Sequence, residues 1–175
     1  MIMAIDPSFS GCGITCFDNG IYQYFLIKTT KSSKNSIDIT RRIIYIKSEV
    51  KKIIKDNDIK SILMEGPSFG SQSSAIVQMG ALNHMLRELF IEMNIPFAIS
   101  PPTVVKKFFT GKGNCGKPEM IAEAMARGAN IPFTEKVKGE ILPDNNVVDS
   151  FAMNLLLQEL LNNPQSTFKD VVEWS

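Results

Sequence analysis

Residues 1–17 read Met-Ile-Met-Ala-Ile-Asp-Pro-Ser-Phe-Ser-Gly-Cys-Gly-Ile-Thr-Cys-Phe, a run of apolar residues that ends in one carboxylate, Asp6. Pro7 follows at once, and a short Ser/Gly turn leads to a second strand-like run at 14–17. A carboxylate at the end of a buried strand is unfavourable unless a metal ion, a cation or hydrogen bonds compensate its charge. Strand tips are also where α/β proteins expose catalytic groups. Asp6 is therefore either the anchor of a site or an acceptor of hydrogen bonds within its own turn.

The composition is that of a soluble globular protein. The 175 residues are 44% hydrophobic and 21% charged, which predicts a single domain over 1–175 with a poorly defined tail after about 163. Asp6 interrupts the N-terminal apolar run, which argues against a membrane span and against a signal peptide. The three cysteines, an odd number without zinc-site spacing, indicate free thiols in a reducing compartment, which favours a cytoplasmic location.

The charge is segregated along the chain although the net charge is only +1. The segments 28–60 and 106–117 are both basic, and together they can form a face that binds a nucleic-acid backbone. A solvated lysine face is the alternative, especially for the first segment.

A second strand repeats the pattern of the first. Residues 21–29 predict a third strand of an antiparallel meander, and isoleucines at helical spacing predict a helix that starts at Asp38 as N-cap. Residues 59–67 then read Ile-Lys-Ser-Ile-Leu-Met-Glu-Gly-Pro, so that an apolar strand again ends in one carboxylate, Glu65. A helical crossover can place this strand beside the first. Two carboxylates at neighbouring tips repel each other unless one is protonated or a divalent cation lies between them.

The middle of the chain carries an aromatic residue that could stack on a base and a helix that could form a subunit interface. Phe69 lies in a Gly/Ser segment directly after Glu65, where it can stack on a nucleobase or else fold into the core. The predicted helix 75–93 has an apolar surface wider than one core-facing stripe, which indicates a subunit interface.

The second half predicts a phosphate site and a third carboxylate. A strand at 95–100 and a short helix precede the glycine-rich loop 110–117. Lys112 and Lys117 of this loop stand at a helix start, where they could contact a phosphate. The loop lacks the residue spacing of a nucleotide-binding P-loop. A polar connection containing Lys136 and Lys138 leads to a helix from 144 to about 161, with Asp144 as N-cap, Asp149 one turn in and Asn146 on the face of Asp149. Pro164 is expected to end the regular structure.

These pieces, in this order, resemble the RuvC family of Holliday junction resolvases, of the ribonuclease H-like fold, over residue 2 to about 161. The resemblance rests on Ala4-Ile5-Asp6-Pro7 with Gly11 and Gly13, on Leu63-Met64-Glu65, on residues 111–117 and on Asp149-Ser-Phe-Ala; it is closest to short, divergent phage-type members. It implies an α/β fold with a five-stranded mixed sheet, a three-strand antiparallel meander plus two parallel strands, flanked by helices.

The resemblance also implies an activity, namely a homodimeric endonuclease that depends on Mg²⁺, with Mn²⁺ as an alternative, and nicks two strands of a four-way DNA junction in recombination, repair or phage DNA processing. Asp6, Glu65 and Asp149 match the family's metal-binding carboxylates, and the helix 75–93 falls where the family dimerises. Candidate DNA contacts are Phe69, Lys106, Lys107, Lys112 and Lys117, of which Lys117 is also the candidate catalytic cation.

Asn146 stands where the family has a fourth carboxylate, so either Asn146 or Asp144 is expected to complete the site, with one or two ions per subunit. Two ions about 4 Å apart hydrolyse a phosphodiester without a histidine base, which suits a chain whose only histidine is His84.

Three other functions fit parts of the sequence. An actin-like ATPase or sugar kinase has a similar opening but needs two domains, which 175 residues cannot hold. A non-catalytic junction-binding protein would gain nothing from acids beside phosphates. A less selective nuclease that cuts forks or flaps uses the same residues as a resolvase.

Overall fold

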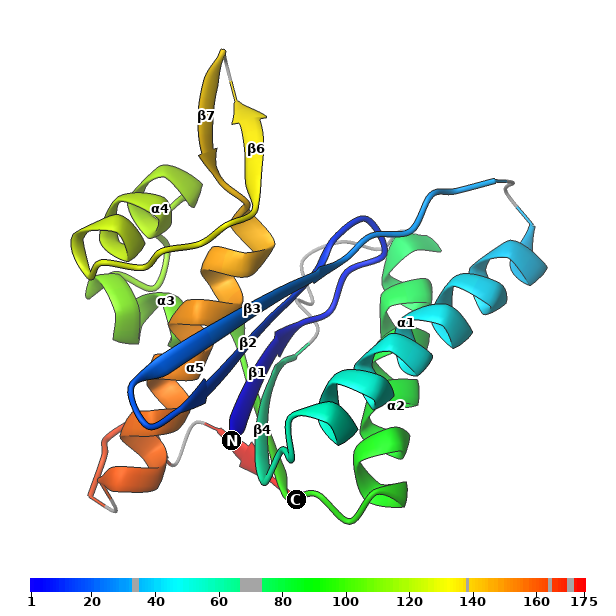
Figure 1. Cartoon of the computed structure of the whole chain (residues 1–175), viewed down its shortest axis with the longest axis horizontal. Helices are drawn as coiled ribbons and strands as arrows, with labels where there is room; N and C mark the ends of the chain where they lie inside the picture. Colours follow the sequence, from blue (N-terminus) through cyan, green and yellow to red (C-terminus); the bar gives the residue numbers. More distant parts are fainter. Residues whose placement is uncertain (33–34, 67–73, 138, 164, 170–171) are drawn as a thin grey trace.

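The computed structural model describes residues 1–32, 35–66, 74–137, 139–163, 165–169 and 172–175, and it shows a mixed sheet with helices on both faces (Figure 1). The sheet has six strands in the order β3-β2-β1-β4-β5-β8. The strands are β1 (Ile2–Asp6), β2 (Cys12–Asp18), β3 (Ile21–Ile27), β4 (Ser61–Glu65), β5 (Phe97–Ser100) and β8 (Glu173–Trp174). The helices are α1 (Ser36–Asp56), α2 (Ser74–Glu92), α3 (Pro102–Thr110), α4 (Lys117–Ala126) and α5 (Asn145–Asn162).

The predicted fold class is confirmed. The strands β1, β2 and β3 form an antiparallel meander, and β4 and β5 pair in parallel beyond β1. The helix α1 is the crossover that returns the chain from β3 to β4 on the far side of β1.

Two elements correct the sequence-based prediction of five strands. The C-terminal segment forms β8, which pairs antiparallel with β5, so regular structure does not end at Pro164. The predicted polar connection is instead a hairpin of β6 (Thr134–Val137) and β7 (Glu140–Pro143). Both elements consist of strands of four residues or fewer, which carry too little alternation to be recognised.

The N-cap of α1 is also corrected. The side chain of Asn35, rather than that of Asp38, caps the helix by accepting a hydrogen bond from the Asp38 amide at 2.9 Å. Asn and Asp are almost equally good caps, so the sequence alone does not separate two candidates three residues apart.

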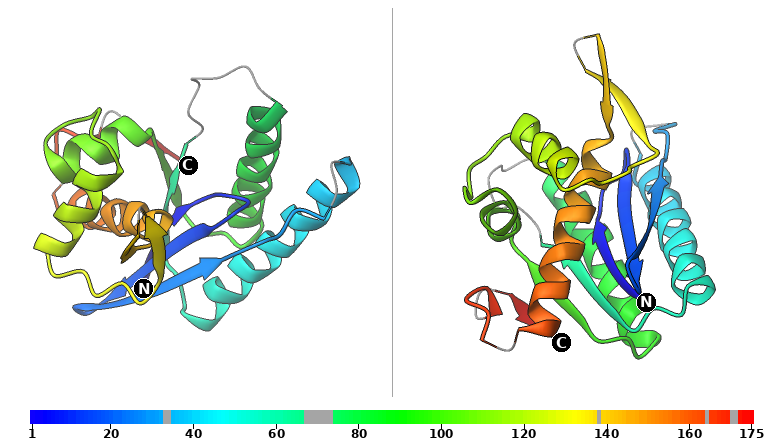
Figure 2. Two further views of the ribbon diagram at one scale, coloured as in Figure 1. Left: turned by 90° about the horizontal axis from the view of Figure 1, so that it is seen from above. Right: turned by 60° about the vertical axis from the view of Figure 1, so that its left-hand side comes forward.

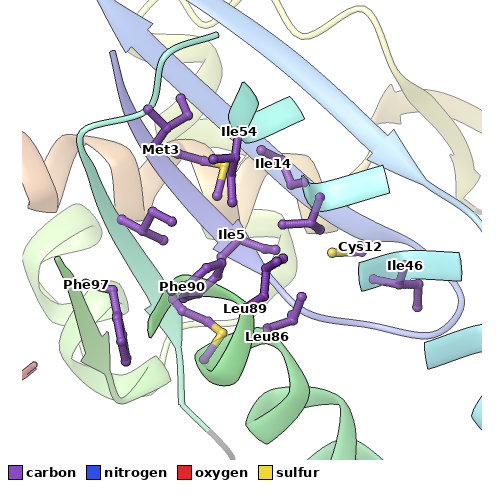
Figure 3. Close-up of a cluster of buried hydrophobic side chains, with 14 of the residues drawn as sticks. Met3, Ile5, Cys12, Ile14, Ile46, Ile54, Leu86, Leu89, Phe90 and Phe97 are labelled. Atoms are coloured by element: carbon purple, nitrogen blue, oxygen red, sulfur yellow. The ribbon is translucent and has the colours of Figure 1, made fainter. Parts of the chain in front are cut away.

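Alternation along the strands divides the core into two layers. Met3 and Ile5 of β1 and Met64 of β4 point to the face covered by α1 and α2. Figure 3 shows Met3 and Ile5 in one cluster with Ile46, Leu86 and Phe90. Ala4 and Leu63 point to the opposite face, which α3, α4 and α5 cover. Since side chains alternate with a period of two, Asp6 and Glu65 follow Ala4 and Leu63 onto the face of α5.

Helix α5 is held over β2 by buried polar contacts. The hydroxyls of Thr15 and Ser150 lie 2.8 Å apart, and the Asn154 amide donates to the Thr15 carbonyl at 2.9 Å. The amide of Gln158, four residues further, donates to Asn154 and to the Tyr22 hydroxyl. These partners recur every four residues, so they fix the position of α5 along the strand and with it the position of Asp149.

In the part of the chain that the structure describes, none of the helices is both long and apolar enough to cross a membrane.

Candidate active site

The tips of β1 and β4 bring two of the predicted carboxylates together. The parallel register pairs Ile5 with Met64, so Asp6 and Glu65 are the next residues on adjacent strands. Asp6 is only 7% exposed, and its side chain shares a hydrogen bond with that of Glu65. A hydrogen bond between two carboxyl groups requires a proton on one of them. Asp6 and Glu65 at the end of the sheet therefore favour either a proton or a cation between them.

Helix α5 brings the third carboxylate, Asp149, to this pair. Its first turn lies directly on β2 at Gly13, where a Cβ atom would stand 2.1 Å from the carbonyl oxygen of Asn146. Only glycine permits this approach, and Gly13 is the direct pairing partner of Asp6. Asp149 consequently lies near enough for its charge to raise the pKa of Asp6.

Burial raises the pKa of all three carboxyl groups, and repulsion by neighbouring acids adds to the increase for Asp6 and Asp149. For Asp6, burial is the largest cause, followed by the charge of Glu65 and the hydrogen bond to it, and the pKa stands well above its ordinary value. Burial likewise raises the pKa of Glu65, although Asp6 and Lys106 lower it. Burial and the charge of Glu65 raise the pKa of Asp149 to about 7. The site favours a compensating positive charge over three bare carboxylates.

The three carboxylates fit a divalent cation by their chemistry, although their side chains are not arranged around one position. Within the described residues, no three His, Cys, Asp or Glu side chains are placed so that they could hold a metal ion as they stand. Asp6 and Glu65 are turned to each other, and Asp149 is turned to Asn145. An all-oxygen set of acidic ligands is what hard divalent cations prefer, and such a cation would replace the shared proton as the compensating charge.

The predicted lysines divide into two groups. Lys106 of α3 is half-buried, and its charge lowers the pKa of Glu65 and Asp149. Lys117 is the first residue of α4, and its charge lowers the pKa of Asp6 and Asp149. Lys107 and Lys112 are exposed, and the structure gives neither a contact with the described carboxylates. Phe69 lies outside the described residues.

The other two predicted metal ligands, Asp144 and Asn146, lie at the start of α5 and are hydrogen-bonded to each other. Asp144 is the N-cap, as predicted, and its carboxylate accepts hydrogen bonds from the backbone and side-chain nitrogens of Asn146, each at 3.1 Å. Asp144 also lies 3.9 Å from the Lys28 ammonium. The Asn146 side chain rests against Gly11, whose added Cβ would stand 2.9 Å from its nitrogen. In this structure both residues shape the helix start beside the three carboxylates.

Asn145 is a functional residue that the sequence reading missed. It is 6% exposed, and its amide nitrogen donates to the Asp149 carboxylate at 3.0 Å. Its side-chain oxygen is buried and has no hydrogen-bond partner within the described chain. The i, i+4 spacing of Asn145 and Asp149 is the signal in the sequence for this contact, whereas the family pattern points to Asn146.

Two further residues that sequence reasoning missed fix the backbone around the carboxylates. The buried amide of Asn83, on α2, donates to the Glu65 carbonyl at 3.1 Å, and Arg87 donates to Asn83 in turn. Arg42, on α1, donates to the Phe9 carbonyl at 3.0 Å and lies over the Phe9 ring at 4.9 Å. Arg42 thus fixes the turn after Asp6, as Asn83 fixes the end of β4.

A cleft of about 420 Å³ opens beside the carboxylates. Glu65 and Asp149 line it together with Lys106 and Asn83, and apolar side chains of α2 close the other side. Acids, a cation and an open volume therefore meet at one end of the sheet, which is the arrangement of an active site for an anionic substrate.

The strand order, the crossover and the helix over the strand tips define a ribonuclease H-like fold, the class that includes RuvC. Thermus thermophilus RuvC matches over 99% of this chain and 100% of its own, with a TM-score of 0.68 at 16% identity. T. thermophilus RuvC in complex with Holliday junction substrate matches over 100% of both chains, with a TM-score of 0.68 at 14% identity.

A third solved structure extends this likeness. The yeast mitochondrial Holliday junction resolvase Ydc2 matches over 87% of this chain and 75% of its own, with a TM-score of 0.52 at 14% identity. No family model matches the sequence, and no curated protein matches it. The RuvC-like fold expected from the sequence is therefore confirmed by structure, at a level of identity where sequence comparison finds nothing.

The raised pKa values predict that the metal-free protein loses stability as the pH rises. The folded state binds protons at these carboxyl groups more tightly than the unfolded chain does, and this tighter binding stabilises the fold. The stabilisation is fully present below the ordinary pKa near 4 and is lost as the pH rises through the pKa in the folded state, about 7 for Asp149. Between pH 5 and pH 8 in EDTA we expect the melting temperature to fall by about 5 °C, or about 2 kcal/mol. Added Mg²⁺ should restore it at pH 8 more than at pH 5. Scanning calorimetry checks this, and a melting temperature that rises over this range would contradict the assignment of raised pKa values.

Proposed function

We propose that residues 1–175 form one nuclease domain that resolves four-way DNA junctions by metal-dependent hydrolysis of phosphodiesters. The observation that carries the proposal is the convergence of Asp6, Glu65 and Asp149, from three separate elements, beside Lys106 and Lys117. The fold shared with a RuvC solved with Holliday junction substrate supports the choice of DNA. The buried, unpaired Cys12, Cys16 and Cys115 support a cytoplasmic location.

Each residue has a distinct task in this proposal. Asp6, the most buried of the three carboxylates, would be the central ligand for Mg²⁺ or Mn²⁺, and Glu65 and Asp149 would complete the acidic ligand set. Bound divalent metal lowers the pKa of a coordinated water and offsets charge at the phosphate. Asn145 orients the Asp149 carboxylate through its 3.0 Å hydrogen bond. Lys117 and Lys106 are cations within reach of the acids and offset the negative charge that a phosphate brings.

We further propose that the protein acts as a homodimer through α2, because a four-way junction presents two equivalent strands. Val77 and Ile91 on α2 are 74% and 66% exposed, although α2 buries Leu82, Leu86 and Leu89 on its other side. A hollow of about 520 Å³ adjoins Ile91 between α2 and the β5–β8 edge. A second copy of this helix would cover these apolar side chains, which a lone subunit leaves in water.

The test is cleavage of a panel of end-labelled DNAs (four-way junction, fork, flap and duplex) with Mg²⁺, with Mn²⁺ and with EDTA. We expect paired nicks on opposite strands of the junction, at least about a hundredfold faster than on duplex, and none in EDTA. Equal rates on forks and flaps would favour the less selective nuclease. Tight junction binding without cleavage in either metal would instead indicate a non-catalytic binding protein and overturn the enzymatic proposal.

A further inference from the structure

The hairpin β6–β7 projects from the body beyond the end of the sheet at which β1 and β4 terminate (Figures 1 and 2). Its four cross-strand pairs run from Thr134 with Pro143 to Val137 with Glu140. Ile141 is 75% exposed, the largest exposed fraction among the large apolar residues of the described chain. Ile141 is therefore free to contact a partner, and its place on an arm at the carboxylate end of the sheet suggests which partner that is.

The two faces of the hairpin differ in character. Cross-strand partners share a face, so Glu135 and Leu142 lie on one face and Lys136 and Ile141 on the other. Leu142 packs against the α5 core layer, and Glu135 accepts a hydrogen bond from the Asn145 amide, so theirs is the inner face. Glu140 alternates to the same face as Glu135. The outer face therefore pairs an exposed cation with an exposed apolar side chain and carries neither carboxylate of the two strands.

The base of the hairpin is tied to the helix that bears Asp149. The backbone N–H of Asp144 donates to the Phe133 carbonyl at 2.9 Å, and the backbone N–H of Asn145 donates to Glu135 Oε1 at 3.2 Å. Asn145 also holds Asp149. Each strand of the hairpin is four residues long and thus spans about 13 Å. A substrate strand at the carboxylates is therefore within reach of the outer face.

We propose that the outer face of this hairpin is a second DNA-contact surface, which engages the branch of the substrate next to the cut phosphate. Lys136 contacts a backbone phosphate, and Ile141 packs on the sugar or base exposed where strands separate. An apolar side chain on a projecting arm is suited to unstacked bases at a branch rather than to the continuous stack of a duplex. The proposal rests on the proposed junction-cleaving function and adds to it a determinant of branch selectivity.

The test compares Ile141→Ser and Lys136→Gln with the wild type. The matched control is Ile21→Ser. It removes an isoleucine that is 64% exposed and is the first residue of β3, directly after the β2–β3 turn. Junction and duplex affinities are measured by fluorescence anisotropy in Ca²⁺ at several salt concentrations, and cleavage is measured in Mg²⁺. All three sites are exposed, and unchanged melting temperatures establish that the variants fold.

Ile141→Ser should weaken junction binding about tenfold and duplex binding less than twofold. Lys136→Gln should weaken both and reduce the slope of log affinity against log salt by about 1. Ile141→Leu should restore junction binding, and Ile21→Ser should behave as wild type. If wild type cuts junctions while Ile141→Ser binds and cuts them equally well, the hairpin inference fails alone. If wild type neither binds nor cuts branched DNA, the proposed function fails with it.

Discussion

Replacing Asp6 with asparagine is expected to reduce junction cleavage by at least about a thousandfold while making the metal-free protein more stable. The loss of activity follows because Asp6 is the carboxylate that both Glu65 and Asp149 approach. The gain in stability follows because the variant no longer buries a third acid in a cluster whose members repel one another. The two effects are measured by single-turnover cleavage in Mg²⁺ and by melting in EDTA at pH 8.

Asp18→Asn is the matched control for this experiment. Asp18 is an exposed carboxylate at the end of β2, and its replacement should change neither cleavage nor the melting temperature. Junction affinity of Asp6→Asn in EDTA should stay within a few-fold of wild type, which separates lost chemistry from lost binding. An Asp6→Asn protein that keeps more than a tenth of wild-type activity would refute the role assigned to this residue.

Gly13→Ala is the second change with a large expected effect. The added methyl group would stand 2.1 Å from the Asn146 carbonyl oxygen and 2.8 Å from the Val147 nitrogen, and both are backbone atoms that no side-chain rotation can move. We expect the free energy of unfolding to fall by about 3 kcal/mol, measured by urea denaturation. Cleavage should fall about a hundredfold even under conditions where the variant is fully folded, because a shift of α5 by about 1 Å displaces Asp149 from Asp6 and Glu65.

The control is the same substitution at Gly80. This glycine lies within α2 with nothing inside 4 Å of an added Cβ, so Gly80→Ala should stabilise the protein by about 0.5–1 kcal/mol. If Gly13→Ala were as stable and as active as Gly80→Ala, the close contact between β2 and α5 would not be needed for the site.

The sequence was sufficient for the parts of the fold that repeat a simple pattern. Apolar strands that end in Asp6 and Glu65, and a helical period between them, predict two adjacent parallel strands, which the structure confirms. Asp144 was identified as the cap of α5 because its residue type and its place before an apolar helix agree.

The remaining features depend on contacts between distant residues. Strand β8 exists because it pairs with β5, and two residues such as Glu173 and Trp174 have no periodicity of their own. The link from Asn145 to Asp149 and the link from Asn83 to Glu65 require the exact face of each helix, which a propensity does not fix.

The position of Asp149 has a consequence for the order in which the protein is made. Asp6 and Glu65 are synthesised well before α5, yet their strands become part of the proposed site only when α5 docks at Gly13, after residue 162 has been synthesised. Domains fold largely as units during synthesis, and pairings between distant segments form late. A nascent chain that has not yet reached α5 carries two of the three acids without the helix that supplies Asp149, so the proposed site is assembled last.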